Sequence, residues 1–388
     1  MRLTSSFVVF RADPEEQDLA RARWLAREGR AADAEREYRA ALALHPDLAT
    51  GWMELFELVR REGRFEEALA VADTAVRHFG PEAAMPLALR GAALAELGRT
   101  REALKALDAS LERDGNLAVA WHELAYAAFR VGESSRALLA LDRAFALEPH
   151  TDTLMLRGRI LREAGQYEAA EVAFEAAQQA TEHDIPQRDA RREVGATRRA
   201  ASLGGKRPRQ FTLRERAFAE SGTVVLAPPP TDDLAAALAA ALAALPALAH
   251  RIGWHPAAVA GAGPDDAPLV AAVAKALEAD AIGAAALDPG DQPLVVTMVN
   301  TGGEDWERQV TRLERWHAGT TFALVQVRGT ATPADIAGLE VGPGEAAQAL
   351  ASARDAFGRE AGPADITEAA ALAASPQAPW RRRHAASE

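Results

Sequence analysis

The side chains that could perform acid–base or metal chemistry lie in the second half of this 388-residue chain. The candidates are His250, His255, His317, Asp265, Asp266 and Glu304. None of the histidines has the H-x-x-x-H or H-E-x-x-H spacing that places two metal ligands on one helix face. His255 and the three carboxylates could form a catalytic or metal site only if the fold brings them together. The alternative is that each of them is a helix cap or an exposed polar residue. We therefore predict no catalytic residue, no metal and no cofactor.

Glycine-rich phosphate loops were the second possibility for chemistry. The chain contains neither G-x-x-x-x-G-K-[ST] nor G-x-G-x-x-G after a strand, which argues against a P-loop and a dinucleotide fingerprint. The nearest sequence is the turn at 300–305, where backbone N–H groups at a helix N-terminus could hold an anion. Asn300, Gly302 and Gly303 thus form a candidate ligand loop. Because Glu304 and Asp305 already complement the helix dipole there, a plain strand-to-helix turn is the preferred interpretation.

The elements of the first half are set by a repeat. Glycine recurs with steps of 34, 35, 34 and 33 residues, and an alanine stands five residues after each glycine. The glycines are Gly29, Gly63, Gly98, Gly132 and Gly165, and the alanines are Ala34, Ala68, Ala103, Ala137 and Ala170. Trp52 and Trp121 occupy an early helical position, and Pro46 and Pro149 close two of the units. Over residues 17–180 this pattern resembles the tetratricopeptide repeat (TPR).

The period predicts an α solenoid, independently of the family name. Each unit is a pair of helices of about a dozen residues, joined by a glycine that can adopt the left-handed conformation. The small residues allow neighbouring helices to approach closely, so stacked pairs share one core and curl around a concave surface. We expect five such pairs followed by a capping helix that ends near residue 200.

The resemblance also implies which residues line the concave surface, because in this family they lie at fixed places on the first helix of each pair. They are Arg23, Arg27, Glu57, Arg60, Arg61, His122, Tyr126, Phe129, Arg130, Arg159 and Arg162. The third pair contributes small apolar side chains, which would form the floor for an extended peptide. The alternative is a solvated helix face with internal Arg–Glu pairs.

A basic stretch follows the repeats. Residues 187–210 carry eight Lys and Arg against two acidic residues, and their first part reads as the solvating cap of the solenoid. Residues 201–210 read as a basic linker. A docking site for phosphate or for an acidic partner is the alternative, although no aromatic residue is interleaved with the cations.

Residues 211–360 have the pattern of a small α/β domain. Strands are expected at 223–227 and 322–327, and the segments 282–287 and 293–299 flank a turn and are expected to pair antiparallel. The prediction is therefore a mixed sheet covered by helices on both faces. The apolar segment 234–249 is shorter than the ~20 residues that a bilayer span needs, and it contains Pro246, so it reads as a core helix.

These elements give an expected organisation of an N-terminal extension at 1–16, repeats with their cap at 17–200, the linker at 201–210, the α/β domain at 211–360, and a C-terminal helix and flexible tail at 361–388. The net charge of −12 argues against a nucleic-acid partner, and the absence of cysteine excludes thiol chemistry. The N-terminal residues lack the apolar run of a signal peptide, so we expect a cytoplasmic location and no membrane partner.

The expected function is a protein–protein interaction adaptor or scaffold that binds a partner peptide or protein in the concave groove. The alternative is an enzyme whose chemistry lies in the α/β domain while the repeats recruit its substrate. The sequence does not indicate the oligomeric state.

Overall fold

The structure is a computed structural model, and it describes residues 14–181, 183–227, 233–357 and 365–379. The chain divides into two compact units, Met1–Ile160 with Val172–Gln187, and Leu161–Glu171 with Arg188–Glu388. The boundary between Gln187 and Arg188 lies inside the expected cap helix, whereas the sequence predicts a domain boundary after residue 200. Residues 1–13 and 380–388, which make up most of the expected N-terminal extension and part of the expected tail, lie outside the described residues.

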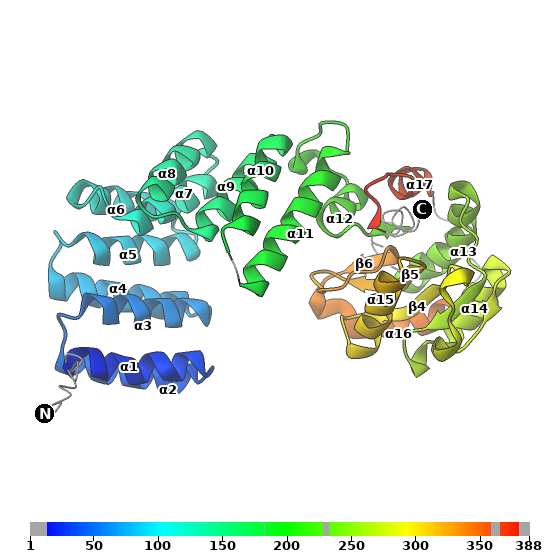
Figure 1. Cartoon of the computed structure of the whole chain (residues 1–388), viewed down its shortest axis with the longest axis horizontal. Helices are drawn as coiled ribbons and strands as arrows, with labels where there is room; N and C mark the ends of the chain where they lie inside the picture. The colour runs from blue at the N-terminus through cyan, green and yellow to red at the C-terminus, as the bar shows by residue number, and fades with distance from the viewer. Residues whose placement is uncertain (1–13, 182, 228–232, 358–364, 380–388) are drawn as a thin grey trace, which may run out of the picture. The chain divides into compact units, whose positions relative to one another are not determined.

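The repeat region consists of helices of 13 to 15 residues that follow one another with short turns (Figure 1). They are α1 (Pro14–Arg27), α2 (Ala31–Leu44), α3 (Ala49–Arg61), α4 (Phe65–Phe79), α5 (Ala84–Glu96), α6 (Thr100–Arg113), α7 (Ala118–Arg130), α8 (Ser134–Leu147), α9 (Thr151–Glu163) and α10 (Tyr167–Gln179). The glycines of the period terminate the first helix of each pair with positive φ, for example +71° at Gly63 and +82° at Gly132. The period therefore marks the helix boundaries, as the sequence predicts.

Small residues of the period let the paired helices approach closely. Ala103 and Ala137 are fully buried. At Gly91 in α5, an added Cβ would lie 2.5 Å from Leu107 Cγ of α6, and Leu107 is itself fully buried. A large residue on one helix thus fills the space left by a glycine on the other, which is how these helix pairs reach the packing density of a protein interior.

The basic stretch becomes α11 (Asp184–Ala201), a 3-10 turn (Pro208–Gln210) and the approach to α12 (Leu213–Ser221). Arg199 is buried, and its guanidinium donates hydrogen bonds to the carbonyl oxygens of Phe218 and Glu220 at 2.9 Å each. These are among the last carbonyls of α12, which a cation at a helix C-terminus can satisfy. Lys206 pairs with Glu215, and its carbonyl oxygen accepts a hydrogen bond from the Tyr167 hydroxyl. The expected linker is therefore tied to its surroundings inside the second unit.

The second unit contains a six-stranded sheet within the described residues. Its strands are β1 (Val224–Val225), β2 (Ala258–Gly261), β3 (Asp280–Ala281), β4 (Leu294–Asn300), β5 (Thr320–Val327) and β6 (Ile336–Val341), in the spatial order β1-β6-β5-β4-β2-β3. All neighbouring strands are parallel, so the predicted mixed sheet is wrong. Residues 282–287 form no strand, and β3 and β4 lie on opposite sides of β2. Two apolar segments separated by a turn look like an antiparallel pair in the sequence. Whether the second segment pairs with the first or crosses to another strand depends on the whole sheet.

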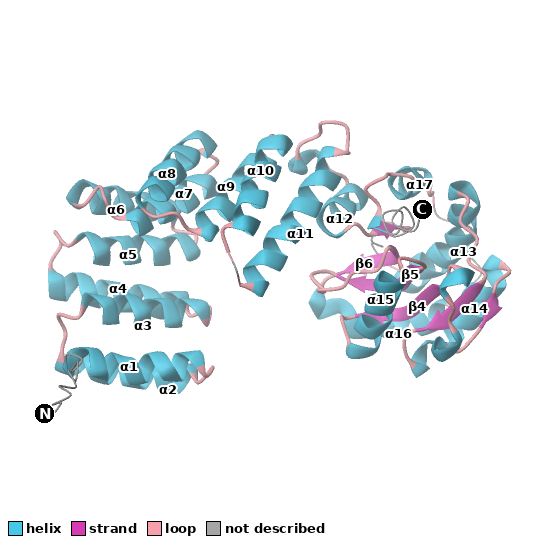
Figure 2. Ribbon diagram, in the orientation of Figure 1, coloured by secondary structure: helices cyan, strands magenta, loops and turns pink. Residues whose placement is uncertain are grey.

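Helices cover both faces of this sheet (Figure 2). One core contains residues of α13 (Leu234–Ile252), α14 (Ala267–Leu277), α16 (Ala346–Ala356) and α17 (Thr367–Ala373), together with sheet residues such as Val296 and Leu324. The opposite core joins α15 (Glu304–Trp316) to sheet residues such as Val295 and Ala323. Among the described residues, α13 alone is long and apolar enough to cross a membrane. In this structure its Leu238, Leu245 and Leu248 are fully buried against the sheet.

Candidate functional site

The first candidate surface is the row of first helices, α1, α3, α5, α7 and α9, which we call the inner row. The small residues predicted as its floor, Ala88, Ala92 and Ala95 of α5, are at most 2% exposed. Arg60 Nη1 of α3 donates to Glu123 Oε1 of α7 at 2.9 Å. The floor is therefore buried, and an ion pair links the helices on either side of α5.

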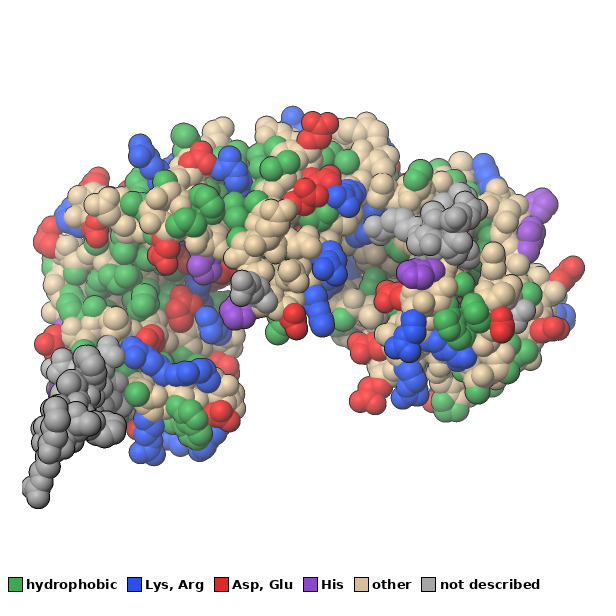
Figure 3. Space-filling view, viewed as in Figure 1, with side chains coloured by type: hydrophobic (Ala, Val, Ile, Leu, Met, Phe, Trp, Pro, Cys, Tyr) green, Lys and Arg blue, Asp and Glu red, His purple; other side chains and the backbone are tan. Residues whose placement is uncertain are grey.

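Three of the seven arginines predicted to face a partner, Arg23, Arg60 and Arg162, form ion pairs within the chain. Arg23 Nε lies 2.9 Å from Glu54 Oε1, and Arg60 contacts Glu57 at 3.2 Å in addition to Glu123. Charged side chains of both signs are interspersed with apolar ones over α1 to α8 (Figure 3). Internal Arg–Glu pairs, the alternative considered from the sequence, are thus present along much of the inner row.

Burial shifts the pKa of two groups in this row. The pKa of the Glu123 carboxyl is raised above its usual range by desolvation, and the nearby Arg60 opposes the rise. Desolvation also lowers the pKa of His122, whose Nδ1 lies 3.4 Å from Thr153 Oγ1. His122 is therefore neutral at pH 7, and does not act as a cation for an acidic partner.

An aromatic cluster at α7 remains accessible. Tyr126 and Phe129 are half-buried, and Arg130 is exposed. The Arg130 guanidinium donates to the Tyr126 hydroxyl at 3.1 Å and its Cζ lies 5.8 Å from the centre of the Tyr126 ring. The Tyr126 hydroxyl lies 3.4 Å from Glu96 Oε2. This cluster presents an apolar ring with a cation and a carboxylate beside it.

The remaining predicted residues do not form one set. Arg27, Arg61 and Arg159 are exposed in the first unit. Arg162 belongs to the second unit, where it pairs with Glu193 of α11. The predicted groove residues thus belong to two compact units, and the structure brings together chiefly those of α3, α5 and α7.

In the second unit, Asn300 of the candidate ligand loop has a structural role. It is 1% exposed, and its amide nitrogen donates to Gln326 Oε1 at 3.0 Å and to the carbonyl oxygen of Thr332 at 2.9 Å. Its side-chain oxygen accepts from the backbone N–H of Gly302 at 2.9 Å. The amide of Asn300 and the N–H of Gly302 are therefore engaged within the chain, whereas Gly303 lines a cavity.

These bonds explain why the fold needs Asn300. The chain passes from β5 to the parallel strand β6 through residues 328–335 without a helix, whereas such crossovers usually take a dozen or more residues. Trp306 Nε1 donates to the same Thr332 oxygen at 2.8 Å, and Asp335 Oδ2 accepts from the Thr321 backbone N–H at 2.8 Å. A buried polar network thus holds this short crossover over the sheet.

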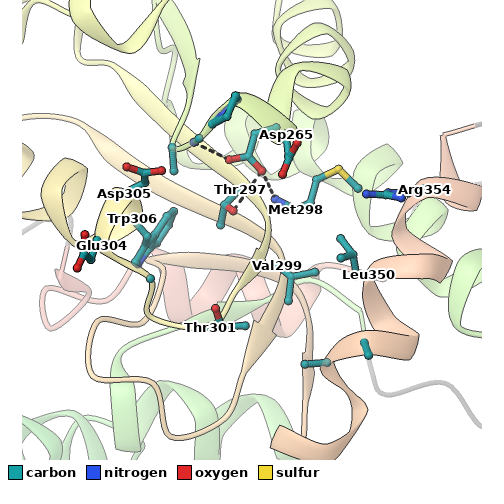
Figure 4. Close-up of a pocket in the computed structure, with 17 residues that line it drawn as sticks. Asp265, Thr297, Met298, Val299, Thr301, Glu304, Asp305, Trp306, Leu350 and Arg354 are labelled. Carbon is teal, nitrogen blue, oxygen red and sulfur yellow. Dashed lines mark hydrogen bonds between the residues drawn. The ribbon is translucent and has the colours of Figure 1, made fainter.

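A cavity of about 620 Å³ lies at the carboxyl ends of β2 and β4. Met298, Leu350 and Arg354 gather on one side of it, and Glu304, Asp305 and Trp306 on the other (Figure 4). It is lined by Ala262, Gly263, Pro264, Asp265, Asp266, Thr297, Met298, Val299, Thr301, Gly303, Glu304, Asp305, Trp306, Ala346, Ala347, Leu350 and Arg354. The cavity thus gathers residues from three separate parts of the chain, 262–266, 297–306 and 346–354.

The fold brings together three of the carboxylates considered from the sequence, Asp265, Asp266 and Glu304, in this cavity, while His255 is exposed and does not line it. Asp266 is 6% exposed and fully engaged. It accepts from the backbone N–H groups of Gly263 at 2.9 Å and Met298 at 2.8 Å, and from Thr297 Oγ1 at 3.2 Å. The pairing of β2 with β4 ends at Gly261 and Val296, so the backbone N–H of Met298 in β4 lies beyond it. The Asp266 carboxylate accepts from this N–H in place of a strand carbonyl. Within the ranges that the structure describes, no three His, Asp or Glu side chains form a group suited to a metal ion.

Sequence reasoning did not identify β2 or Arg354 as parts of this site. β2 is four residues long, and its Ala-Val-Ala-Gly sequence carries a weak strand pattern. A usable signal was the pair Gly261 and Gly263 before a helix, since a Cβ at Gly261 would lie 3.0 Å from the Gly263 oxygen. Arg354 comes from α16, and no local pattern connects it to Asp265.

Residues 19–84, 53–118 and 122–185 match the tetratricopeptide repeat family. A comparison with curated proteins gives no match. Solved structures that resemble the chain include a thermophilic TPR protein of Thermus thermophilus, at 19% identity over 47% of this chain and 98% of the other, with a TM-score of 0.42. The type IV pilus biogenesis factor PilW matches at 19% identity over 50% of this chain and 89% of its own, with a TM-score of 0.42. Residues 19–185 of this protein are a tetratricopeptide repeat region.

Proposed function

We propose that this protein is an interaction scaffold whose repeat region, made of five tetratricopeptide helix pairs, binds a protein or peptide partner along the inner row. Members of this family generally bind protein or peptide partners, which supports the general class. The observation that carries the site is the cluster of Tyr126, Phe129 and Arg130, where half-buried aromatic rings stand beside an exposed cation. Aromatic residues and arginine dominate the binding energy of most protein interfaces.

The internal ion pairs indicate which kind of contact would hold a partner in the inner row. Arg23 is paired with Glu54, and Arg60 with Glu57 and Glu123, so these two arginines are partly neutralised within the chain. A partner held there should depend on an apolar anchor at Tyr126 and Phe129. The exposed Arg27, Arg61 and Arg130 would then govern the association rate and its salt dependence more than the final affinity.

Site-specific photo-crosslinking in the native cell tests this placement. A photo-reactive residue at Arg61 or Phe129 should capture a specific partner, whereas one at the exposed Arg143 of α8 should not. With the captured partner purified, Phe129→Ala should weaken binding by ~1–3 kcal/mol. Phe145→Ala is the matched control, because Phe145 is a partly exposed phenylalanine outside the inner row. Capture from Arg143, or equal binding by both variants, would assign recognition to another surface.

The enzyme alternative has one observation in its favour, the cavity that gathers Asp265, Asp266 and Glu304. Against it, Asp266 is engaged by three donors and His255 does not line this cavity, so these two residues do not form an acid–base pair there. The expected cytoplasmic location stays a prediction that cell fractionation of the tagged chain can test.

A further inference from the structure

The strand order of the second unit creates a crevice at the carboxyl end of β2. The chain passes from β2 to β3 on one side and then returns to β4 on the other side of β2. The helix after β2, α14, contributes to one core, and the helix after β4, α15, contributes to the opposite core. The loops after β2 and β4 therefore diverge, and such switch points are where open α/β sheets bind ligands.

A cavity of about 540 Å³ lies at this crevice, where β2 and β3 end. It adjoins the cavity of Figure 4 but extends away from α16, toward the segment after β3. Its lining comes from three parts of the chain, 261–271, 281–284 and 305–309. The volume lies in the range of small-molecule sites.

Gln309 of α15 places an unsatisfied acceptor at this cavity. The residue lines the cavity and is 7% exposed, and its side-chain oxygen has no hydrogen-bond partner within the part of the chain that the structure describes. A buried acceptor without a donor costs free energy. Because the terminal torsion of a glutamine is soft, the amide can turn toward the cavity, where a donor from a ligand would satisfy the oxygen.

The rest of the lining suits an uncharged ligand. Among the described residues that line this cavity, Asp305 and Arg308 carry charge, and they pair with each other at 3.0 Å. Val270 of α14 and Ile282 after β3 are half-buried and supply apolar surface. The cavity therefore combines an apolar wall with one amide side chain, which is how small-molecule sites are commonly built.

A phosphate group is disfavoured beside this cavity. A helix N-terminus is the usual place for a phosphate, but the Asp266 carboxylate stands at the start of α14 and accepts from the Gly263 N–H at 2.9 Å. The first turn of α15 likewise carries carboxylates of its own, which complement the helix dipole. A phosphorylated ligand would meet like charge at both helices.

We propose that this cavity binds an adenine nucleoside, with the exocyclic amine of the base donating to Gln309 and the flat ring lying against Val270 and Ile282. A glutamine amide matches this base, because it can pair with the amine and the neighbouring ring nitrogen of adenine together. The uncharged nucleoside is favoured over its phosphates. The proposal concerns the second unit and is independent of partner binding by the repeats.

Ligand-observed NMR with the full chain and three matched probes provides the test. Adenosine and purine riboside differ only in the exocyclic amine, and adenosine and AMP differ only in the phosphate. We expect adenosine to bind with a submillimolar dissociation constant, as its size allows. Purine riboside should bind about tenfold more weakly, the factor that one lost hydrogen bond corresponds to, and AMP should also bind more weakly than adenosine.

Two pairs of variants locate the binding. Gln309→Leu should weaken adenosine binding about tenfold and leave purine riboside binding unchanged, so that the two probes become equal. Gln348→Leu is the control, because this glutamine is exposed on α16 and does not line the cavity. Ala271→Trp should fill the cavity and abolish binding of both probes, whereas Ala276→Trp, exposed later on α14 outside the cavity, should not.

Circular dichroism confirms that each variant is folded. Absence of adenosine binding, equal binding of adenosine and purine riboside by the parent chain, or full adenosine affinity in either Gln309→Leu or Ala271→Trp would overturn the proposal. AMP that binds as tightly as adenosine would overturn the preference for the uncharged nucleoside.

Discussion

Arg60 of α3 and Glu123 of α7 form an ion pair at 2.9 Å although 63 positions separate them and the complete helix pair α5–α6 lies between them in sequence. The helix between them in the inner row, α5, carries small buried side chains such as Ala88 and Ala92. Glu123 is 6% exposed and Arg60 is its ion-pair partner among the described residues. The pair therefore links second-neighbour repeats, whose association otherwise passes through α5.

Replacing Arg60 by Met should lower the free energy of unfolding by about 2–3 kcal/mol, because it leaves a buried carboxylate without its cation. The value is at the low end for such pairs, since the Arg60 side chain is 25% exposed. Urea unfolding of the full chain, followed at the repeat transition, measures the change. Arg61→Met, at an exposed neighbour, should stay within about 0.5 kcal/mol. Equal effects of the two substitutions would show that the pair contributes nothing specific.

The loss of stability caused by Arg60→Met should depend on pH. Burial raises the pKa of Glu123 above its ordinary value of 4.5, so the native state binds this proton more tightly than the unfolded state. The contribution of Glu123 to stability is then present at low pH and is lost as the pH rises through its folded pKa. Without Arg60 the pKa rises further, so the deficit of Arg60→Met should be larger at pH 8 than at pH 5. Adding Glu123→Gln should remove that difference.

Gly91→Ala should destabilise the repeat region by about 1–3 kcal/mol, because the new methyl group would stand 2.5 Å from Leu107 Cγ in a filled core. Overpacking should exceed the gain of about 1 kcal/mol in helix propensity. Ala125 occupies the same place in the next repeat, seven residues before the turn glycine. Thermal unfolding should show Gly91→Ala melting below the parent, and an unchanged or higher melting temperature would contradict the packing described for α5 and α6.

Asp266→Ala should lower the free energy of unfolding by about 2–3 kcal/mol, since it leaves the buried Met298 N–H and Thr297 hydroxyl without their acceptor. Asp265→Ala is the matched control, because this neighbouring aspartate is exposed. It should change stability by less than about 0.5 kcal/mol. Hydrogen exchange at Met298 should also become faster in Asp266→Ala alone. Similar behaviour of the two variants would contradict the structural role of Asp266.

Asn300→Ala should cost about 1–3 kcal/mol, because Gln326 and the 328–335 crossover lose a buried donor. Thr301→Ala, at the exposed next residue, should be nearly neutral. Limited proteolysis should show faster cleavage at Arg328 in Asn300→Ala. If Asn300→Ala is as stable as the parent, the residue does not hold the crossover and its assignment to a ligand loop becomes the better one.

Local interactions explain what the sequence determined by itself. The turn glycines and the alanines of the period specify helix pairs, since φ and side-chain size act between residues that are close in the chain or in adjacent units. The start of α12 is local in the same way, because Thr212 Oγ1 accepts from the backbone N–H of Glu215, three residues later, at 3.1 Å. Each of these interactions spans a few residues or one repeat, so the spacing alone predicts it.

Tertiary structure decided the rest. The parallel pairing of β2 with both β3 and β4, the buried hydrogen bonds of Asn300 and Asp266, and the cavity that both Arg354 and Asp265 line all join segments that no short pattern connects. Such contacts depend on the direction in which each crossover returns, which is governed by the burial of the whole sheet. For the same reason, internal Arg–Glu pairs could be expected from the sequence, but not that Arg60 would pair with Glu123. Which side chains meet across α5 depends on how the helices stack.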